Sequence, residues 1–504
     1  MKKRIVSMIL SAMLLCSVLS GFAGCSGARE SGAEADSPSQ NAVPEEQGGE
    51  AGGEETAAAE VSAAEALGFE ACDNGGRTFT VLSNMYKPYE FNTDELTGDV
   101  VNDAVYEKDQ LVMEYLGIEI KDILEDGDWP ARDAFNAKIT QAVTAGDGAY
   151  DMVMNTMVCT MPISTQGVFL DGKLLKYADF DHPWWISDMY DRFSICGKLY
   201  GFLGDFSLSL YKDLSVIFFN KRIWKDYTDR DPYELVKNNE WVLDTFTGLC
   251  SGMSVDLNGD GKWAPEDDQI TYVSEFVPGG TFQTVLELPL VEKNADGIPE
   301  FSGLTEKFAA AYEKVMAFYS NADNLHYSSI DDKSYKSQKY FAGSRVATMC
   351  NFIYSTEYLR DMDDDYGIVP MPKYDEAQQK YIAQLGTSTC MMFVPLTTPD
   401  RELTSRVMEC LAFFGYTCVS PKYYEVALKE KYARDAEIHE MLDIIRAGAT
   451  LDFLFVYGTS LNSAPNSMFR NYSDAPVASQ FASIDKPFSK SLEKIVEAYQ
   501  GIEH

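Results

Sequence analysis

The sequence has little histidine and no closely spaced cysteine pair. Its four histidines are His182, His326, His439 and His504. They stand too far apart to form a local metal-ligand motif, so neither a zinc site nor a histidine-based catalytic triad is supported. None of the cysteines forms a Cys-x-x-Cys pair. Apart from Cys16 and Cys25 near the start, the cysteines are Cys72, Cys159, Cys196, Cys250, Cys350, Cys390, Cys410 and Cys418. We predict free, mostly buried thiols rather than a disulfide framework.

Basic residues are also scarce. The chain carries 42 Lys and Arg against 78 Asp and Glu, for a formal net charge of -36. A polyanion such as DNA or RNA would be repelled, whereas an uncharged or cationic ligand is compatible with this field. The sequence therefore predicts no nucleic-acid partner.

Long apolar runs are absent after the first residues of the chain. A basic start is followed by the apolar stretch 5–19 and by small residues around Cys25, which is typical of an export signal. We expect residues 1–24 to be a lipoprotein signal peptide. The motif Phe22-Ala23-Gly24-Cys25 resembles the lipobox of bacterial lipoproteins, although Phe22 departs from the usual leucine. This resemblance implies that Cys25 is lipidated and holds the protein at a membrane.

Residues 25–70 are expected to be a lipid anchor followed by a tether. Ala, Gly, Glu and Ser dominate this stretch, so it cannot bury enough apolar surface to offset its chain entropy. Its negative charge favours an extended chain. We predict a disordered acidic tether that ends near residue 70.

The folded part begins with alternating strand and helix patterns. Buried strands are predicted at 78–82, 118–120 and 150–154, and helices are predicted over 101–115 and 132–145. This order is typical of an α/β fold with a largely parallel sheet. The pattern restarts with a strand at 216–220, a helix over 304–319, short strands at 346–350 and 367–370, and an apolar helical stripe over 403–414.

Six motifs in this region resemble the extracellular solute-binding proteins of bacterial ABC importers, in particular the sugar-binding lipoproteins of Gram-positive bacteria. They are 145–153 (AGDGAYDMV), 167–171 (GVFLD), 196–201 (CGKLYG), 218–221 (FFNK), 341–349 (FAGSRVATM) and 366–372 (YGIVPMP). They occur in the family order. The resemblance implies a two-lobe, type II periplasmic-binding-protein-like α/β fold whose hinged lobes are joined by crossing strands. Lobe 1 is expected at 71–205 with 370–419, and lobe 2 at 206–369 with 420–504.

The resemblance also implies a ligand site between the lobes. Aromatic faces give apolar area to a sugar ring, and carboxylates and amides bind its hydroxyl groups. The residues expected to contact ligand are Tyr86, Asn155, Thr156, Asp205, Tyr211, Asp213, Asn351, Tyr354 and Tyr457. Each of them is open to a purely structural interpretation. For the pair Trp184 and Trp185 we favour packing inside a lobe over ligand stacking.

A stretch at 256–267 matches the twelve-residue calcium-loop pattern. The predicted ligands are Asp256, Asn258, Asp260, Lys262 through its backbone carbonyl, and Asp267. Gly261 permits the sharp turn at the sixth position. We expect a structural calcium ion, although Asp267 stands where a longer glutamate is usual and an acidic turn without metal is the alternative.

Taken with the resemblance, these features predict a non-enzymatic, monomeric receptor at the outer face of a cell membrane. The resemblance implies that it captures a carbohydrate, an oligosaccharide in particular, and delivers it to the permease subunits of an ABC transporter. No organic cofactor is expected. The alternatives are a secreted glycoside hydrolase, which needs two positioned carboxylates, and a surface adhesin. No phosphate loop, nucleophile elbow or HExxH motif is present.

Overall fold

The structure is a computed structural model that describes residues 62–503, except 87, 92, 322, 328–335, 425–435, 462–467 and 471. The predicted signal peptide 1–24, the lipidated Cys25 and most of the tether lie outside the described residues. Within the described residues, no helix is both long enough and apolar enough to cross a membrane.

A four-stranded sheet forms the first α/β unit. Its strand order is β12-β3-β1-β2, in which β1 pairs in parallel with β2 and β3, and β12 is antiparallel to β3. The strands are β1 (Arg77–Asn84), β2 (Ile118–Glu125), β3 (Met152–Thr156) and β12 (Cys390–Phe393). Three strands come from the start of the chain and the fourth arrives more than 230 residues later. The predicted parallel strands are confirmed, and β12 was not foreseen.

Helices of this unit follow the predicted apolar stripes. The helix α4 (Val100–Leu116) begins at Asp99, whose side chain accepts hydrogen bonds from two backbone N–H groups of the first turn, and it ends at Gly117 with φ 59°. A Cβ at Gly117 would lie 2.8 Å from the backbone of Asp73, so the turn also requires a close approach. The other helices around this sheet are α5 (Arg132–Ala145), α6 (Met157–Thr160), η1 (Met161–Gln166), η2 (Gly172–Leu174), α7 (Ser187–Phe193) and α16 (Arg401–Phe414).

The predicted tether ends earlier than residue 70. Residues 62–70 are folded and include the short helix α2 (Ala63–Leu67), whose Leu67 is buried. The ring of Phe69 lies 6.2 Å from that of Tyr115, and the Tyr115 hydroxyl donates to the Phe69 carbonyl at 2.7 Å. Composition alone suggested disorder here because a few apolar residues among many small ones give no periodic signal.

A five-stranded sheet forms the second unit, with the order β10-β4-β9-β5-β8. The strand β9 is parallel to β5 and antiparallel to β4, and β10 is antiparallel to β4. The strands are β4 (Ser215–Asn220), β5 (Ile270–Glu275), β8 (Asn324–Tyr327), β9 (Val346–Phe352) and β10 (Tyr366–Pro370). This sheet is therefore mixed, whereas the first is parallel apart from β12.

Many short helices surround the second sheet. They are α9 (Lys221–Tyr227), α10 (Pro232–Lys237), α11 (Leu243–Cys250), α12 (Phe276–Gly280), α13 (Phe282–Val285), α14 (Glu306–Tyr319), α15 (Lys336–Ala342), η3 (Ile353–Glu357) and α17 (Ala436–Ala447). The antiparallel pair β6 (Val291–Lys293) and β7 (Pro299–Phe301) precedes α14. The helix predicted over 304–319 is confirmed as α14, with Phe308, Tyr312 and Val315 on its buried side.

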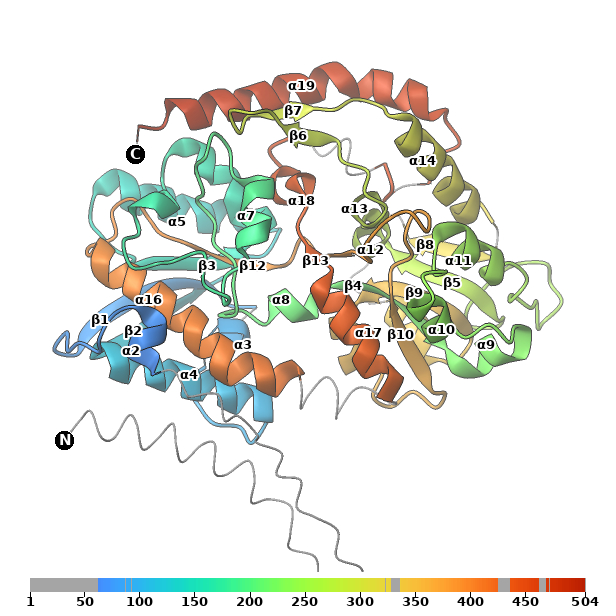
Figure 1. Cartoon of the computed structure of the whole chain (residues 1–504), viewed down its shortest axis with the longest axis horizontal. Coiled ribbons are helices and arrows are strands. Elements are labelled where there is room, and N and C mark those ends of the chain that lie inside the picture. Colours follow the sequence, from blue (N-terminus) through green and yellow to red (C-terminus); the bar gives the residue numbers. More distant parts are fainter. Residues whose placement is uncertain are drawn as a thin grey trace, which may run out of the picture. The chain divides into compact units, whose positions relative to one another are not determined.

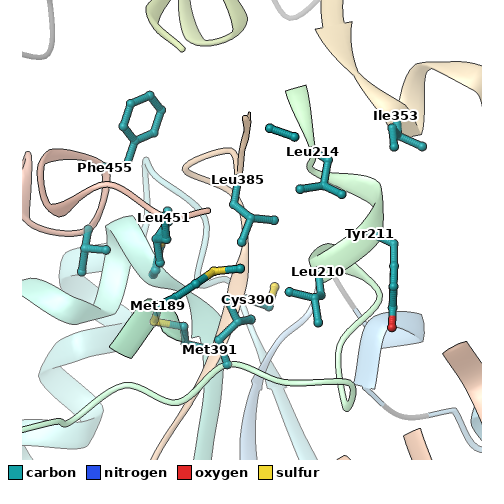
Figure 2. Close-up of a cluster of buried hydrophobic side chains, with 14 of the residues drawn as sticks. Met189, Leu210, Tyr211, Leu214, Ile353, Leu385, Cys390, Met391, Leu451 and Phe455 are labelled. Atoms are coloured by element: carbon teal, nitrogen blue, oxygen red, sulfur yellow. The ribbon is translucent and has the colours of Figure 1, made fainter. Parts of the chain in front are cut away.

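The chain passes several times between the two units. The crossing segments include α8 (Ser209–Lys212), β11 (Ala383–Gln384) and β13 (Ala449–Thr450). Three further short helices, α3 (Pro88–Phe91), η4 (Gly415–Val419) and α18 (Phe453–Tyr457), contact elements of the first unit. The short strands β11 and β13 pair in parallel, and Leu214 forms a bridge with Leu385. Figure 2 shows Leu214, Leu385, Leu451 and other apolar side chains gathered where these segments meet. The two-unit α/β architecture with crossing segments is therefore confirmed.

The lobe boundaries predicted within the crossing segments stay a prediction. The last part of the chain contacts both units, because α18 packs on α6 and α7 whereas Phe469 packs against Phe308 of α14. The C-terminal helix α19 (Val477–Gly501) also touches elements of both units (Figure 1).

Candidate functional site

The carboxyl ends of β1, β2 and β3 meet at one edge of the first sheet, because these strands are parallel and in register. Asn84 stands opposite Glu125 in the β1–β2 pair, and Ser83 stands opposite Met154 in the β1–β3 pair. The loops that follow these strands therefore lie side by side. This edge of the first sheet is the candidate ligand-binding surface.

Beneath that edge lies a hydrogen-bonded amide pair. The Asn84 amide donates to Asn155 Oδ1 at 2.9 Å, and the Asn155 amide donates to the Gly127 carbonyl at 3.1 Å and to Thr160 Oγ1 at 2.9 Å. Both asparagines are buried. A Cβ at Gly127 would lie 2.9 Å from the Asn155 side chain, so only glycine allows this approach. Asn155, predicted to contact ligand, thus holds three loops together in this structure.

Thr156 closes the same strand. Its side chain is buried, and its hydroxyl, which interacts with the Cys159 thiol, makes no hydrogen bond of good geometry. An unsatisfied buried hydroxyl costs free energy, and a ligand hydroxyl is one group that could satisfy it. Among the predicted ligand residues of the first unit, Thr156 keeps its bonding capacity and Asn155 does not.

Two exposed aromatic side chains and a half-buried acidic one form the outer part of the edge. Tyr86 is 57% exposed and Trp129 is 44% exposed. The Tyr86 hydroxyl lies 3.5 Å from Asp126 Oδ2. The Arg132 guanidinium lies 4.1 Å from the centroid of the Trp129 ring and donates to the Trp129 carbonyl at 2.6 Å. Arg132 therefore covers one face of Trp129 and fixes the orientation of the ring.

Sequence reasoning missed Trp129 and Asp126. A signal for them was present, because the segment 126–130 (DGDWP) follows an apolar strand and combines turn residues with an aromatic ring. We name the set of exposed Tyr86 and Trp129 with half-buried Asp126 and Arg132 the aromatic edge. It can stack on an apolar ring face and accept hydrogen bonds from hydroxyl groups.

In the second unit, Asn351 lies in a buried polar chain at the end of β9. Its amide donates to Ser337 Oγ at 2.9 Å, and its Oδ1 accepts from the Phe352 backbone at 2.8 Å. Ser337 in turn donates to Glu275 at 2.7 Å, at the end of β5. Asn351 is therefore engaged by the protein. The Tyr354 ring is half-buried, 6.0 Å from Phe352 and 6.4 Å from the more exposed Tyr358.

Asp213 and Asp205 tie the crossing segments together. Asp213 Oδ2 accepts from Ser388 Oγ at 2.9 Å, and its backbone carbonyl accepts from the Gly386 N–H at 2.9 Å. Asp205 accepts from the hydroxyls of Tyr211 and Ser420. Both aspartates are buried, and burial raises the pKa of Asp205 above its usual value.

Tyr211 connects that junction to α17. The Arg446 guanidinium lies 5.0 Å from the Tyr211 ring and donates to its hydroxyl at 3.2 Å.

Tyr457 is also buried. Its hydroxyl lies 2.8 Å from that of Tyr499 and donates to the Phe193 carbonyl at 3.0 Å. Of the nine predicted ligand residues, Tyr86 is exposed and Tyr354 half-buried, whereas the other seven lie inside the protein. The structure places Asn155 and Thr156 beneath the aromatic edge, and it places Asp205, Tyr211 and Asp213 at the junction of the crossing segments.

The predicted calcium loop is folded by bonds between its side chains and its own backbone. Asp256 accepts from Gly259 and Gly261, at 2.7 and 2.8 Å, and Asp260 accepts from Lys262 at 2.8 Å. Asn258 accepts from the Asp260 N–H at 2.8 Å, while Asp267 is exposed. The buried carboxylate is Asp268, which accepts from Leu257 and Ala264. Bonds from these backbone N–H groups lower the pKa of Asp268.

Gly259 and Gly261 both have φ of 74°, as the tight turn requires. Across the part of the chain that the structure describes, no group of three or more His, Cys, Asp and Glu side chains is placed to hold a metal ion. The oxygen donors at the first, third and fifth loop positions have the right chemistry for calcium. The ion stays a prediction.

Trp184 and Trp185 pack inside the first unit rather than in the candidate site. Both indole N–H groups donate to the buried Glu409 of α16, at 2.8 and 2.9 Å. The same carboxylate contacts His182 Nδ1 at 2.6 Å. Burial raises the pKa of Glu409, and this effect outweighs the hydrogen bonds from His182, Trp184 and Trp185, which lower it. The packing interpretation of the two tryptophans is confirmed by their burial.

The eight cysteines of the described chain are free, and five of them are buried. This confirms the prediction of unpaired thiols. Burial raises the pKa of Cys250 and of Cys350, each to about 12, so these thiols are neutral at physiological pH.

Comparisons with known proteins find likeness among solved structures. No family model matches the chain, and no curated protein matches it. A receptor, GacH of Streptomyces glaucescens GLA.O, studied with and without acarbose, has a TM-score of 0.48 at 12% identity, with 85% of this chain and 98% of that one covered. Maltose-bound MalE3 of T. maritima has a TM-score of 0.48 at 10% identity, with 84% and 99% covered.

The third structure is the ABC substrate-binding protein Lmo0181 of Listeria monocytogenes in complex with cycloalternan. Its TM-score is 0.48 at 12% identity, with 84% of this chain and 99% of that one covered. We draw no functional conclusion from likenesses of this size.

Proposed function

We propose that the chain is an extracellular solute-binding receptor that captures a carbohydrate between two α/β units and delivers it to an ABC permease. The observation that carries the proposal is the aromatic edge at the carboxyl ends of β1 and β2, in a chain whose two units are joined by several crossing segments. An exposed tryptophan with one face covered by Arg132 leaves its other face for a ring. Asp126 supplies acceptors for hydroxyl groups.

The proposed mechanism is reversible capture without covalent chemistry. Ligand would bind the aromatic edge while the units are apart, and contacts from the second unit would then favour the closed arrangement. In the second unit, half-buried Tyr354 and exposed Tyr358 follow the end of β9 and could supply such contacts. A ligand can shift this equilibrium only by binding the closed arrangement more tightly.

Export and anchoring belong to the same proposal. The apolar start of the sequence and the motif around Cys25 support a lipid anchor, and the acidic segment after it would let the folded part stand away from the membrane. We expect Cys25→Ala to release the mature protein into the medium. Fatty-acid labelling should occur only when Cys25 is present.

The test of the receptor function is a thermal-shift and calorimetry screen over mono- and oligosaccharides, with product analysis of every mixture. We expect one or more sugars to raise the melting temperature without being cleaved. Trp129→Ala should weaken binding about tenfold or more, the equivalent of ~1.4 kcal/mol, because the stacking face is lost. Trp129→Phe should keep most of the affinity.

The matched control is Tyr227→Ala. Tyr227 is 42% exposed, but it ends α9 in the second unit, away from the aromatic edge. Equal losses for Trp129→Ala and Tyr227→Ala would contradict the assignment of the site. Turnover of a sugar would favour a glycoside hydrolase, and binding to surface polymers alone would favour an adhesin.

We also propose that the loop 256–267 binds calcium and stabilises the second unit. Oxygen atoms of Asp256, Asn258 and Asp260 occupy the first, third and fifth positions, and Gly261 adopts the left-handed conformation at the sixth. This ion would be structural, because the loop is remote in sequence from the residues of the aromatic edge.

A further inference from the structure

The C-terminal helix α19 is long enough to contact both α/β units, and its two ends have different partners. It contains 25 residues, so its axis spans roughly 37 Å. Figure 1 shows it running from the neighbourhood of α14 and β7 to that of α7, and its contacts with β7, α14 and η1 agree with this path. Its buried residues are Val477, Phe481, Phe488, Leu492, Ile495 and Tyr499.

The first half of α19 packs on the second unit through aromatic rings. The Phe481 ring lies 4.9 Å from Phe308 of α14 and 6.2 Å from Phe301 of β7. Phe488 lies 4.8 Å from the same Phe301 ring. Gln480 donates to the Tyr312 hydroxyl at 2.9 Å. These contacts are mostly apolar and bury one stripe of the helix.

The last turn of α19 is held to the first unit by polar contacts. The buried Tyr499 hydroxyl lies 2.8 Å from Ser164 Oγ of η1 and 2.8 Å from the Tyr457 hydroxyl. Its ring lies 5.2 Å from that of Tyr200. Lys198 donates to the Tyr499 carbonyl at 2.7 Å and also to the Ile502 carbonyl. A cation at the carbonyl end of a helix is in addition favoured by the helix dipole.

Pro487 stands between the two contact regions. Proline has no N–H group, so the helix lacks the backbone bond that would join residue 487 to Ser483. The proline ring also crowds that carbonyl, which makes this turn the easiest one to bend. Ser489 and Ser491, in the next turn, donate to Asp485 and to the Pro487 carbonyl.

We propose that α19 is a strap that limits how far the two units can separate, with Pro487 as its bending point. Because its two ends contact Phe308 and Ser164 of different units, an opening that separates these residues must bend the helix or detach one of its ends. The β6–β7 hairpin beneath it is a second link, because Lys293 donates to Ser194 Oγ at 2.8 Å and the Cys196 N–H donates to the Gly297 carbonyl at 3.1 Å. The strap acts on the same movement that ligand capture would use, so its effect on affinity rests on the proposed function. Its effect on the distance between the units does not.

The test is single-molecule FRET on the unliganded protein. Fluorophores are attached through non-canonical amino acids at positions 119 and 229, which are exposed and lie in the first and second units. Cysteine labelling is unsuitable because Cys72, Cys196 and Cys418 are partly exposed. One variant is Tyr499→Phe, which removes the hydroxyl group that contacts the first unit. The other is Phe481→Leu, which replaces the ring packed on the second unit with a smaller aliphatic side chain.

We expect each single variant to raise the population of separated molecules about fivefold, comparable to the loss of one hydrogen bond or of part of a buried ring. The double variant should add little to the larger single effect, because a strap released at one end no longer restrains the other. Pro487→Ala should narrow the distance distribution, since it restores the missing backbone bond. Lys494→Ala, exposed on the same helix, should change nothing.

Two results would overturn the strap. One is a lower melting temperature for both single variants with an unchanged FRET distribution, which would mean local packing only. The other is a double variant whose effect is the full product of the two single effects, which would mean that the ends act independently. Neither result bears on sugar binding, so the strap and the receptor function can fail separately.

Discussion

The sheet of the first unit and the sheet of the second unit are both covered by helices, yet they bury different chemistry. The first unit buries Lys108, Asp109 and Glu409, all 3% exposed or less. The second unit buries a cluster of aromatic rings, with Trp241, Phe246 and Tyr272 fully inside. Neighbouring rings in this cluster lie 5.5 Å apart for Trp241 and Phe246, and 4.9 Å apart for Tyr272 and Phe318.

The buried charges of the first unit form a compact set beside α4. Lys108 donates to the Phe91 carbonyl and lies 3.1 Å from Asp109 Oδ1. Asp109 also accepts from the Thr93 N–H at 3.1 Å. A cavity of about 10 Å³, room for about one water molecule, is lined by Asp109 and Asp122 among apolar side chains.

This difference determines whether the stability of each unit depends on pH or on packing. Burial raises the pKa of Asp109 and of Asp122, each to about 6, despite the nearby Lys108. The stability of the first unit should therefore depend on pH. The aromatic core of the second unit around Trp241, Phe246 and Tyr272 is uncharged, and the pKa of Asp268, the buried carboxylate of its loop 256–267, is lowered rather than raised. The stability of this core should therefore depend on volume and shape.

The largest expected effect is that of Lys108→Met. Removing the cation takes away the partner that lowers the pKa of Asp109, so at pH 7.5 the buried carboxyl group must ionise unpaired or bind a proton. We expect this to cost up to about 3–5 kcal/mol of unfolding free energy. Near pH 5 the carboxyl group is protonated and the cost should fall. Urea unfolding at both pH values measures this.

The control for this experiment lies in the second unit. Trp241→Leu removes a buried ring and the bond from its indole N–H to the Pro370 carbonyl at 2.8 Å. Its cost should be the same at both pH values. If Lys108→Met were equally costly at pH 5 and pH 7.5, the buried charges would not distinguish the two units.

A smaller effect is expected from calcium, and only in the second unit. At a calcium concentration 100 times its dissociation constant, binding should stabilise that unit by about 2.7 kcal/mol. Chelation should reverse the gain, as followed by the melting temperature. Asp256→Ala should remove the response, whereas Asp229→Ala, an exposed acidic residue of the same unit, should keep it. An identical melt with calcium and with chelator would show that the loop is an acidic turn.

The smallest expected effect is that of Asp122→Asn in the first unit. Because its folded pKa is raised, Asp122 binds a proton more tightly in the folded state, so its ionisation costs stability as the pH rises from about 4 through 6. Asparagine stays neutral and can still accept from Ser83, which donates to Asp122 at 2.8 Å. The variant should gain on the order of 1–2 kcal/mol at pH 7.5 and almost nothing at pH 4.

Glu119→Gln is the matched control for Asp122→Asn. Glu119 is exposed on the same strand, so neutralising it should leave the pH dependence unchanged. A gain for Asp122→Asn that is equal at pH 4 and pH 7.5 would contradict the assigned cause, since burial of the charge would then not be responsible.

Local patterns predicted the regular elements better than the site. The strand at 150–154 and the helix over 101–115 were recognisable because apolar spacing of 2 or 3.6 residues is a local property. The strand β12 was missed because its four apolar residues have no local signal that distinguishes them from a helix. The predicted ligand residue Tyr457 occupies the interior, since only the packed structure brings it to Tyr499 and Phe193.

Composition and short-range periodicity were enough to predict the α/β order of the described chain, its lack of basic surface and its unpaired cysteines. Tertiary structure alone decided which polar residues remain available to a ligand. Asn155 and Asn351 form hydrogen bonds with groups that are distant in sequence, whereas Trp129 stays exposed beside Tyr86. It also decided that α19 contacts both units, since burial of its Phe481 and Tyr499 requires surfaces that form only when the whole chain has folded.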